Sequence, residues 1–365
     1  MVIRYDDMKI DKLLIKEYQR QLETDLKRIS GLNDIDILLR GFENVFAKYI
    51  GTKHAIAVSS GTDALQLSLL SLGVGKGDSV IMPDLTYPAV PLSVIYTGAE
   101  PIIIDVKKDD LEINEDLIEK NIKKNTKAII AVHMFARPCN LDKILEIGRK
   151  YNLYVIEDCC QAESSEYKDK KVGSFGDLSC FSFSYYKPLS SCGGGGGMVC
   201  FNDEKYKKIA DYTKVWKDDE ALLEAGKRFT KMYFLDLAAV KVKFRYLKEI
   251  IKSRLKTKKI YEETLIKIKQ LKIFRDMPET ISVPQNFVVY PEEKNKLGKF
   301  LKENGVLWME PYQPLHRIRI LSKYSKGNYP VSEEYYNRTI QLPLFSFMNE
   351  EYCLHITNAI SRFYK

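Results

Sequence analysis

The sequence has no long hydrophobic run and no cysteine pattern typical of a secreted or zinc-binding protein. No apolar stretch among its 365 residues reaches the roughly 18 residues that cross a bilayer, and residues 1–7 lack the apolar core of a signal peptide. The seven cysteines are odd in number, and Cys159 and Cys160 are adjacent, without a CxxC spacing. Such usage is typical of reduced thiols. We therefore expect a cytoplasmic protein with no membrane-inserted segment and no bound metal.

A dinucleotide-binding motif is also missing. Between the first predicted strand and its helix the chain reads Ser59-Ser60-Gly61-Thr62-Asp63, where a Rossmann enzyme needs GxGxxG to approach a pyrophosphate. The glycine run at 193–197 precedes a predicted strand, not a helix. A nicotinamide or sugar-nucleotide enzyme on a Rossmann fold is therefore disfavoured.

The net charge of +8 comes largely from a basic stretch at residues 241–275. Such a stretch can bind nucleic acid, but few aromatic side chains accompany it and no helix-turn-helix or zinc-finger pattern is present. We interpret it as the solvated face of helices and expect no nucleic-acid partner.

Short apolar runs alternate with helical patterns between residues 52 and 200. Continuous Val/Ile runs are typical of strands buried on both faces, and strands that alternate with helices predict a mostly parallel, doubly wound α/β sheet. Ligands of such sheets bind at the carboxyl ends of the strands. The predicted strands are 54–58, 79–82, 101–106, 127–132, 153–156 and 198–201, with helices at 62–72 and 141–151.

The pattern changes after residue 202. Residues 235–273 form a long lysine-rich helical region, and the final ninety residues mix short strands and helices. We predict an N-terminal segment and a large α/β domain over 1–235, and a smaller α+β domain over 236–365 that closes over the sheet.

Lys187 and Asp158 carry the chemistry. Lys187 follows an aromatic run at 181–186, and Asp158 ends the strand that begins at 153. A lysine amine forms a Schiff base with pyridoxal 5'-phosphate (PLP), and an aspartate holds the pyridine nitrogen protonated. Burial lowers the pKa of such a lysine, so that the freed amine acts as a base. The pair predicts a PLP enzyme.

Five further residues are candidates to hold this cofactor. Gly61 and Thr62 open a helix after the first strand and form either a phosphate cradle or a plain N-cap. Tyr87 follows the second strand and either stacks on the ring or packs. Gln161 is placed to donate to the ring oxygen, and Ser182 to the phosphate.

Two histidines follow predicted strands or loops near the site. His316 is a candidate contact to the substrate, and the alternative is a histidine satisfied by local hydrogen bonds. His133 ends a buried strand and has either a functional or a structural role.

The motifs together resemble the DegT/StrS-type sugar aminotransferases of the fold-type I PLP class. The similarity runs from about Phe42 to the C-terminus. The matching segments occur in one order: 60–65 (SGTDAL), 83–87 (PDLTY), 132–135 (VHMF), 156–162 (IEDCCQA), 176–177 (GD), 181–183 (FSF) with Lys187, 311–316 (PYQPLH) and 342–344 (LPL).

The resemblance implies an aminotransferase that moves an amino group from glutamate onto a keto group of a nucleotide-linked sugar. It implies a homodimer in which each active site takes residues from both subunits. By position, Lys187 becomes the Schiff-base lysine and Asp158 the partner of the ring nitrogen. The remaining cofactor contacts fall on Tyr87, Gln161, Gly61, Thr62 and Ser182.

The chain departs from the family pattern at several positions. Gly194 stands where an acid is usual, Pro188 where an asparagine follows the lysine, and residues 136–138 read Ala-Arg-Pro instead of Gly-Gln-Pro. An asparagine expected near Phe229 is absent, and Arg228 or Lys231 would have to replace it. These losses keep open a non-catalytic or regulatory member. A sugar dehydratase would carry histidine at Lys187.

Overall fold

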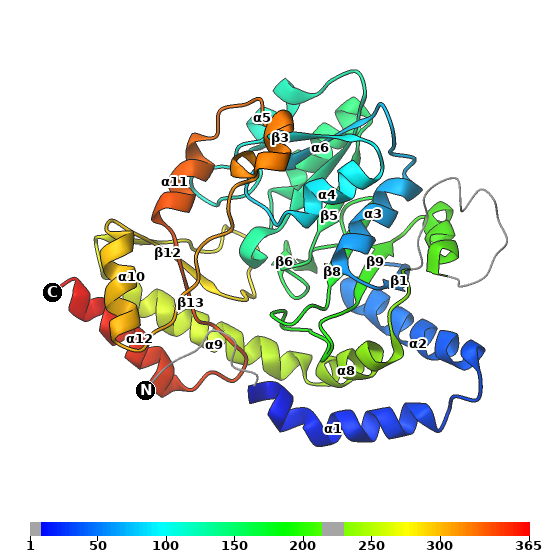
Figure 1. Cartoon of the computed structure of the whole chain (residues 1–365), viewed down its shortest axis with the longest axis horizontal. Coiled ribbons are helices and arrows are strands. Elements are labelled where there is room, and N and C mark those ends of the chain that lie inside the picture. Colours follow the sequence, from blue (N-terminus) through cyan, green and yellow to red (C-terminus); the bar gives the residue numbers. More distant parts are fainter. Residues whose placement is uncertain (1–8, 214–229) are drawn as a thin grey trace.

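The computed structural model describes residues 9–213 and 230–365 (Figure 1). Its centre is a sheet of seven strands in the order β1-β9-β8-β5-β4-β2-β3. β9 runs antiparallel to β1 and β8, and the other pairs are parallel. The prediction of a mostly parallel sheet is confirmed. The strands are β1 His54–Val58, β2 Ser79–Pro83, β3 Glu100–Ile104, β4 Thr126–Val132, β5 Tyr154–Asp158, β8 Leu178–Ser182 and β9 Gly197–Phe201.

Helices cover both faces of this sheet because successive strand side chains point to opposite sides. Ile129 and Val155 pack in one hydrophobic core with Phe46, whereas Ile130 packs in the other with Leu65. The covering helices are α2 Leu32–Ile50 and α6 Leu141–Tyr151 on the first face, and α3 Gly61–Ser71 and α4 Ala89–Tyr96 on the second. The sheet is therefore doubly wound.

The C-terminal part has a core of its own. Tyr261, Leu297 and Ile356 are fully buried in it. A three-stranded antiparallel sheet of β10 Leu271–Ile273, β12 Phe287–Pro291 and β13 Ile340–Leu342 packs with α9 Leu247–Leu265, α10 Lys294–Glu303 and α12 Glu350–Phe363. Across residues 9–213 and 230–365, no helix combines the length and the apolar character that crossing a membrane requires.

The predicted helical region at 235–273 consists largely of two helices, and its end, which includes β10, is not helical. α8 spans Phe234–Arg245, the chain turns at Tyr246, and α9 follows before β10. Leu237 and Val240 of α8 belong to the core of the large sheet, and the second core begins at Tyr261. The boundary after residue 235 stays a prediction, and this packing favours a boundary within α9.

The remaining elements are short or peripheral. α1 Lys9–Leu26 packs along α8 (Figure 1). The others are α5 Glu115–Asn121, α11 Pro330–Arg338, the strands β6 Glu166–Tyr167, β7 Lys170–Lys171 and β11 Thr280–Ile281, and 3-10 turns at Met134–Ala136, Glu204–Thr213, Leu315–Arg317 and Arg319–Tyr324.

Candidate active site

A cavity of about 420 Å³ lies at the carboxyl ends of the parallel strands. The sheet supplies one wall and the C-terminal part supplies the other. All seven residues predicted to bind the cofactor line this cavity: Gly61, Thr62, Tyr87, Asp158, Gln161, Ser182 and Lys187. The structure thus brings together residues that are up to 126 positions apart, from 61 to 187.

The N-terminus of α3 forms one end of the cavity. Ser60 caps the helix, and its hydroxyl oxygen accepts from the Asp63 N–H. A Cβ atom at Gly61 would lie 2.8 Å from both Cys160 Sγ and Ser182 Cβ, so the site requires glycine. The first N–H groups of a helix have no intrahelical acceptor and carry partial positive charge. This end of the cavity therefore suits a phosphate group.

Asp158 is the last residue of β5 and is only 5 % exposed. Its Oδ1 accepts from the Cys160 N–H at 3.0 Å, and its backbone oxygen accepts from the His133 N–H. The carboxylate lines the cavity. A buried carboxylate is stable only opposite a cation or several donors, which is what a protonated pyridine nitrogen provides.

Glu157, next to Asp158, points to a structural cluster instead. Its carboxylate accepts from the N–H groups of residues 173, 175 and 176 at 2.7–2.8 Å and lies 3.2 Å from His133 Nε2. His133 Nδ1 accepts from the Cys139 N–H, so Nε2 carries the proton and donates to Glu157. Cys159 Sγ lies within 4.8 Å of both groups. His133 lines the cavity, but its ring serves to hold the strand ends.

Lys187 lies in the loop after β8, which ends at Ser182 within the aromatic run. Its Nζ donates to Gln285 Oε1 at 3.5 Å. Loss of hydration on burial lowers the pKa of the Lys187 amine. The amine is therefore closer to the neutral, nucleophilic form than a surface lysine is.

Gln161 holds a strained bend beside the cavity. Its Oε1 accepts from the Phe135 N–H at 3.0 Å. Phe135 and Ala136 both have positive φ, +54° and +64°, a conformation that non-glycine residues rarely adopt. Gln161 lies on the cavity wall with its oxygen engaged, and its Nε2 donates one hydrogen to Met134 Sδ at 3.5 Å. The second N–H of the amide is the part left to face a ligand.

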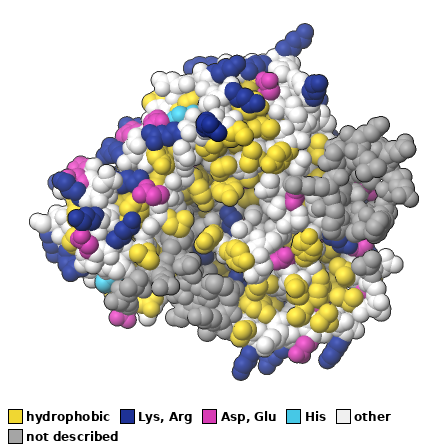
Figure 2. Space-filling view, viewed as in Figure 1, with side chains coloured by type: hydrophobic (Ala, Val, Ile, Leu, Met, Phe, Trp, Pro, Cys, Tyr) yellow, Lys and Arg dark blue, Asp and Glu magenta, His cyan; other side chains and the backbone are white. Residues whose placement is uncertain are grey.

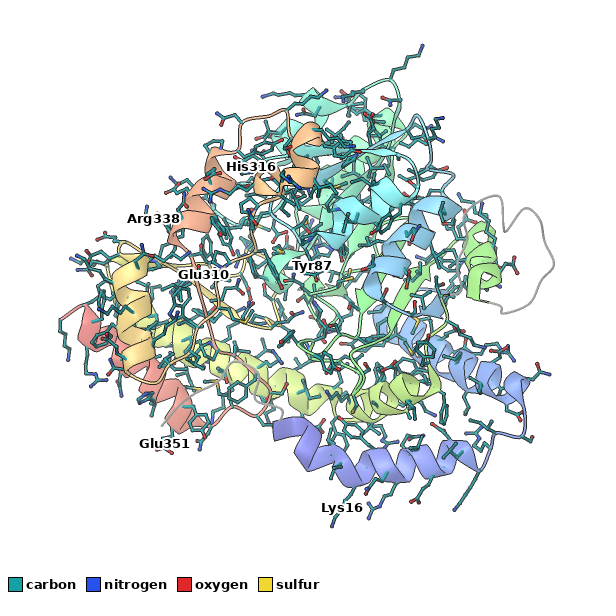
Figure 3. All side chains as sticks on the ribbon, viewed as in Figure 1. Lys16, Tyr87, Glu310, His316, Arg338 and Glu351 are labelled. Carbon is teal, nitrogen blue, oxygen red and sulfur yellow. The ribbon has the colours of Figure 1, made fainter. Side chains whose placement is uncertain are left out.

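Tyr87 lies at the cavity mouth and is 56 % exposed (Figure 3). Its ring meets Tyr312 edge-on at 5.7 Å, and Tyr312 in turn lies parallel to Phe135. Tyr87 thus keeps exposed surface at the cavity, which suits stacking on a planar ring.

The structure does not bring His316 into the cavity. Its Nδ1 lies 2.6 Å from Asp84 Oδ2 and its Nε2 lies 2.6 Å from Glu333 Oε1, and its ring stacks on Tyr329 at 4.7 Å. Both ring nitrogens of His316, which Figure 3 labels, are therefore engaged. The predicted substrate contact has no support from this position, and the alternative of local hydrogen bonds fits it.

The departures from the family pattern have structural counterparts. Gly194 has φ +75°, and a Cβ there would lie 2.3 Å from Tyr185 Cε2. Arg137 donates to the backbone oxygens of Asp110 and Arg275 and so ties the large domain to the segment before β11. Lys231 pairs with Asp36. The predicted positions Arg228 and Phe229 lie outside the described residues.

The opposite wall comes from residues that the sequence analysis missed. Gln285, Asn286, Met309 and Tyr312 line the cavity from the C-terminal part. No periodic motif marks them, because they lie in irregular segments. Two signals were available: Tyr312 stands in the 311–316 segment that resembles the family, and Gln285 and Asn286 are adjacent amides directly before the apolar strand β12.

Comparison with known proteins agrees with this geometry. The model of the DegT/DnrJ/EryC1/StrS aminotransferase family matches residues 36–361. The chain therefore belongs to this family, whose members depend on PLP, and it is an enzyme of the aminotransferase type.

Named relatives are similar over most of their length. The GDP-perosamine synthase of Escherichia coli O157:H7 is 33% identical over 338 residues, with 89% of this chain and 90% of that protein covered. The dTDP-3-amino-3,6-dideoxy-alpha-D-galactopyranose transaminase of Aneurinibacillus thermoaerophilus is 30% identical, with 95% and 96% covered. The crystal structure of S. venezuelae DesV in complex with a ketimine intermediate superposes with a TM-score of 0.92 at 26% identity, covering 100% of this chain and 99% of that one.

Proposed function

We propose that the protein is a PLP-dependent aminotransferase that moves an amino group from glutamate onto a keto group of a nucleotide-linked sugar. The observation that carries this proposal is the convergence of Lys187, Asp158 and the N-terminus of α3 on one cavity. The nucleotide-sugar acceptor rests on the names of the relatives, which make GDP- and dTDP-linked amino sugars.

The residues present fit the cofactor at its phosphate, its ring nitrogen, its aldehyde carbon and its ring oxygen. The glycine-walled end at Gly61 suits the phosphate, with Thr62 and Ser182 beside it. Asp158 suits the ring nitrogen, and Lys187 suits the aldehyde carbon. Tyr87 offers a ring face at the cavity mouth, and the Gln161 NH2 group suits the ring oxygen.

When bound, PLP supplies an aldehyde that accepts the amine and a ring that withdraws electrons from the carbon bearing it. The protein residues do the rest. Asp158 keeps a proton on the ring nitrogen, and the α3 N-terminus fixes the phosphate. Lys187, with its lowered pKa, accepts a proton from the amino donor's carbon and returns one to the sugar carbon.

We also propose a homodimer. Tyr87, Tyr185 and Tyr186 are each 56 % exposed, and all but Tyr185 line the cavity. Figure 2 shows hydrophobic side chains gathered in the middle of this face, around the place where Figure 3 labels Tyr87. Exposed apolar patches of this kind mark interaction surfaces. Light scattering after size exclusion tests the proposal, and a monomeric mass at micromolar concentration would refute it.

A spectroscopic titration tests the proposed reaction. Purified protein supplied with PLP should be yellow, and glutamate should bleach the visible absorbance. Lys187→Ala should abolish turnover. Absence of the visible band, or full turnover by Lys187→Ala, would exclude the proposal. A bound cofactor that reacts with no amino acid would favour the non-catalytic alternative.

A further inference from the structure

Two adjacent buried amides face the cavity from the C-terminal part. Gln285 and Asn286 are 7 % and 6 % exposed, and both line the cavity. Among the described residues, Gln285 Nε2 and Asn286 Oδ1 have no hydrogen-bond partner. Buried polar atoms without partners are rare and costly. Their position on the cavity wall indicates that a ligand supplies the missing bonds.

The orientation of the Gln285 amide follows from its neighbours. Its Oε1 accepts from Lys187 Nζ at 3.5 Å, so its NH2 group is the free end. Arg254 fixes the backbone here by donating to the oxygens of Pro284 and Gln285 at 2.9 and 3.4 Å. The cavity therefore receives one hydrogen-bond donor from Gln285.

The orientation of Asn286 is set by a relay of amides. Gln341 Nε2 donates to the backbone oxygen of Glu310 at 3.1 Å; Figure 3 labels Glu310 in the C-terminal part. Gln341 Oε1 is then the acceptor for Asn286 Nδ2, and Asn286 Oδ1 is left free. Asn286 and Gln285 are adjacent in the chain and line the same cavity, so a ligand there is offered one acceptor and one donor.

A donor next to an acceptor matches a hydroxyl group, which both accepts and donates. A carboxylate or a phosphate only accepts and would face the Asn286 oxygen without a proton to share. An ammonium group only donates and would leave Gln285 Nε2 unsatisfied. The pair therefore favours a hydroxyl-bearing ligand over the carboxylates of an amino acid.

We propose that Gln285 and Asn286 recognise a hydroxyl group of the sugar acceptor, on a carbon adjacent to the one that receives the amino group. The adjacency follows from Lys187, which hydrogen-bonds the same Gln285 amide and delivers the proton to the reacting carbon. This inference rests on the proposed function and adds a specificity determinant to it.

The test measures the two half-reactions separately. A panel of GDP-, dTDP- and UDP-linked 3-keto and 4-keto hexoses first identifies an acceptor, and its counterpart deoxygenated beside the keto carbon is then compared with it. Wild-type enzyme should prefer the hydroxylated sugar by at least about 100-fold in kcat/KM, since sites built around a substrate hydroxyl reject analogues that lack it. Equal use of the two sugars by wild-type enzyme would overturn the inference without any variant.

Asn286→Leu should reduce this preference to within about threefold while the half-reaction with glutamate changes less than about threefold. Gln313→Leu, at an exposed amide outside the cavity, is the matched control and should keep both. A preference retained in Asn286→Leu, or an equal loss in the glutamate half-reaction, would overturn the inference. If wild-type enzyme fails to react with glutamate at all, the proposed function fails instead.

Discussion

The two walls of the cavity are held in different ways. The sheet wall comprises Gly61, Asp158, Ser182 and Lys187. The first three are positioned by strand ends and a helix N-terminus, whose geometry the backbone dictates, and Lys187 lies in the loop that follows β8. The C-terminal wall (Gln285, Asn286, Met309 and Tyr312) lies outside regular elements and is positioned by side chains such as Arg254 and Gln341. The first wall suits a constant cofactor, and the second suits a substrate that differs between relatives.

Removing the amine of the sheet wall should have the largest effect. Lys187→Ala should lower kcat by about 10³-fold or more, because the variant loses the amine proposed to carry the proton. Its folding should be unimpaired, since a buried amine is costly to hold. Stopped-flow absorbance with glutamate gives the rate. Lys170→Ala, at an exposed lysine, is the control.

Breaking the support of the C-terminal wall should have the next largest effect. Arg254 is 5 % exposed and bonds Ser346 as well as the 284–285 backbone. Arg254→Met should cost about 1.5–3 kcal/mol in the free energy of unfolding, the range for hydrogen bonds to a charged group.

Because the C-terminal wall is proposed to contact the sugar, Arg254→Met should raise KM for the sugar more than KM for glutamate. Urea unfolding and separate half-reaction kinetics measure the two effects. Arg319→Met, at an exposed arginine, should leave both unchanged. Equal changes in the two KM values would remove the distinction between the walls.

Replacing Gly194 by the acid that is usual in the family should have a smaller effect on stability. Gly194→Asp should lower the free energy of unfolding by about 1–2 kcal/mol, because φ +75° disfavours a side chain. Adding Tyr185→Ala to the Gly194→Asp variant should recover only the part of the lost free energy of unfolding that comes from the contact with the Tyr185 ring. Urea denaturation of the wild type, the two single variants and the double variant measures this coupling. If the two changes in the free energy of unfolding are additive, residues 194 and 185 are not in contact.

The weakest expected effect is a pH dependence of thermal stability that comes from His316 and Asp84. Burial alone would lower the pKa of His316, but hydrogen bonds with Glu333 and Asp84 raise it above 6.5. Burial also raises the pKa of Asp84. A group whose pKa is higher in the folded state than in the unfolded state stabilises the fold when it is protonated. This contribution is fully present below the pKa of the unfolded state and is lost as the pH rises through the pKa of the folded state.

The thermal midpoint should therefore fall as pH rises above about 6.5, the ordinary pKa of histidine, and fall less in His316→Gln. Glu333 has its pKa lowered to about 2, chiefly by Arg317, so its contribution is lost only as pH falls below 4.5 towards that value. It does not act in the measured window. Parallel curves for wild type and His316→Gln would show that His316 holds no proton specifically in the folded state.

The sequence predicted the sheet wall because local signals mark it. A strand that ends in Asp158 and a Ser-Gly-Thr turn before a helix are short patterns with fixed geometry. The C-terminal wall was missed because its residues become polar neighbours only through distant contacts. Gln285 and Lys187 are 98 positions apart, and no periodicity encodes such a pair. The contacts of His316 could not be predicted for the same reason, because Asp84 is 232 positions away in the sequence.

The bend at Phe135 and Ala136 has a consequence for engineering. Two consecutive non-glycine residues with positive φ place a local energetic cost of roughly 1–2 kcal/mol each beside the cavity. Ala136 is fully buried and does not line the cavity. Ala136→Gly should thus raise the thermal unfolding midpoint without a change in substrate preference, which makes this bend a starting point for engineering a more thermostable enzyme.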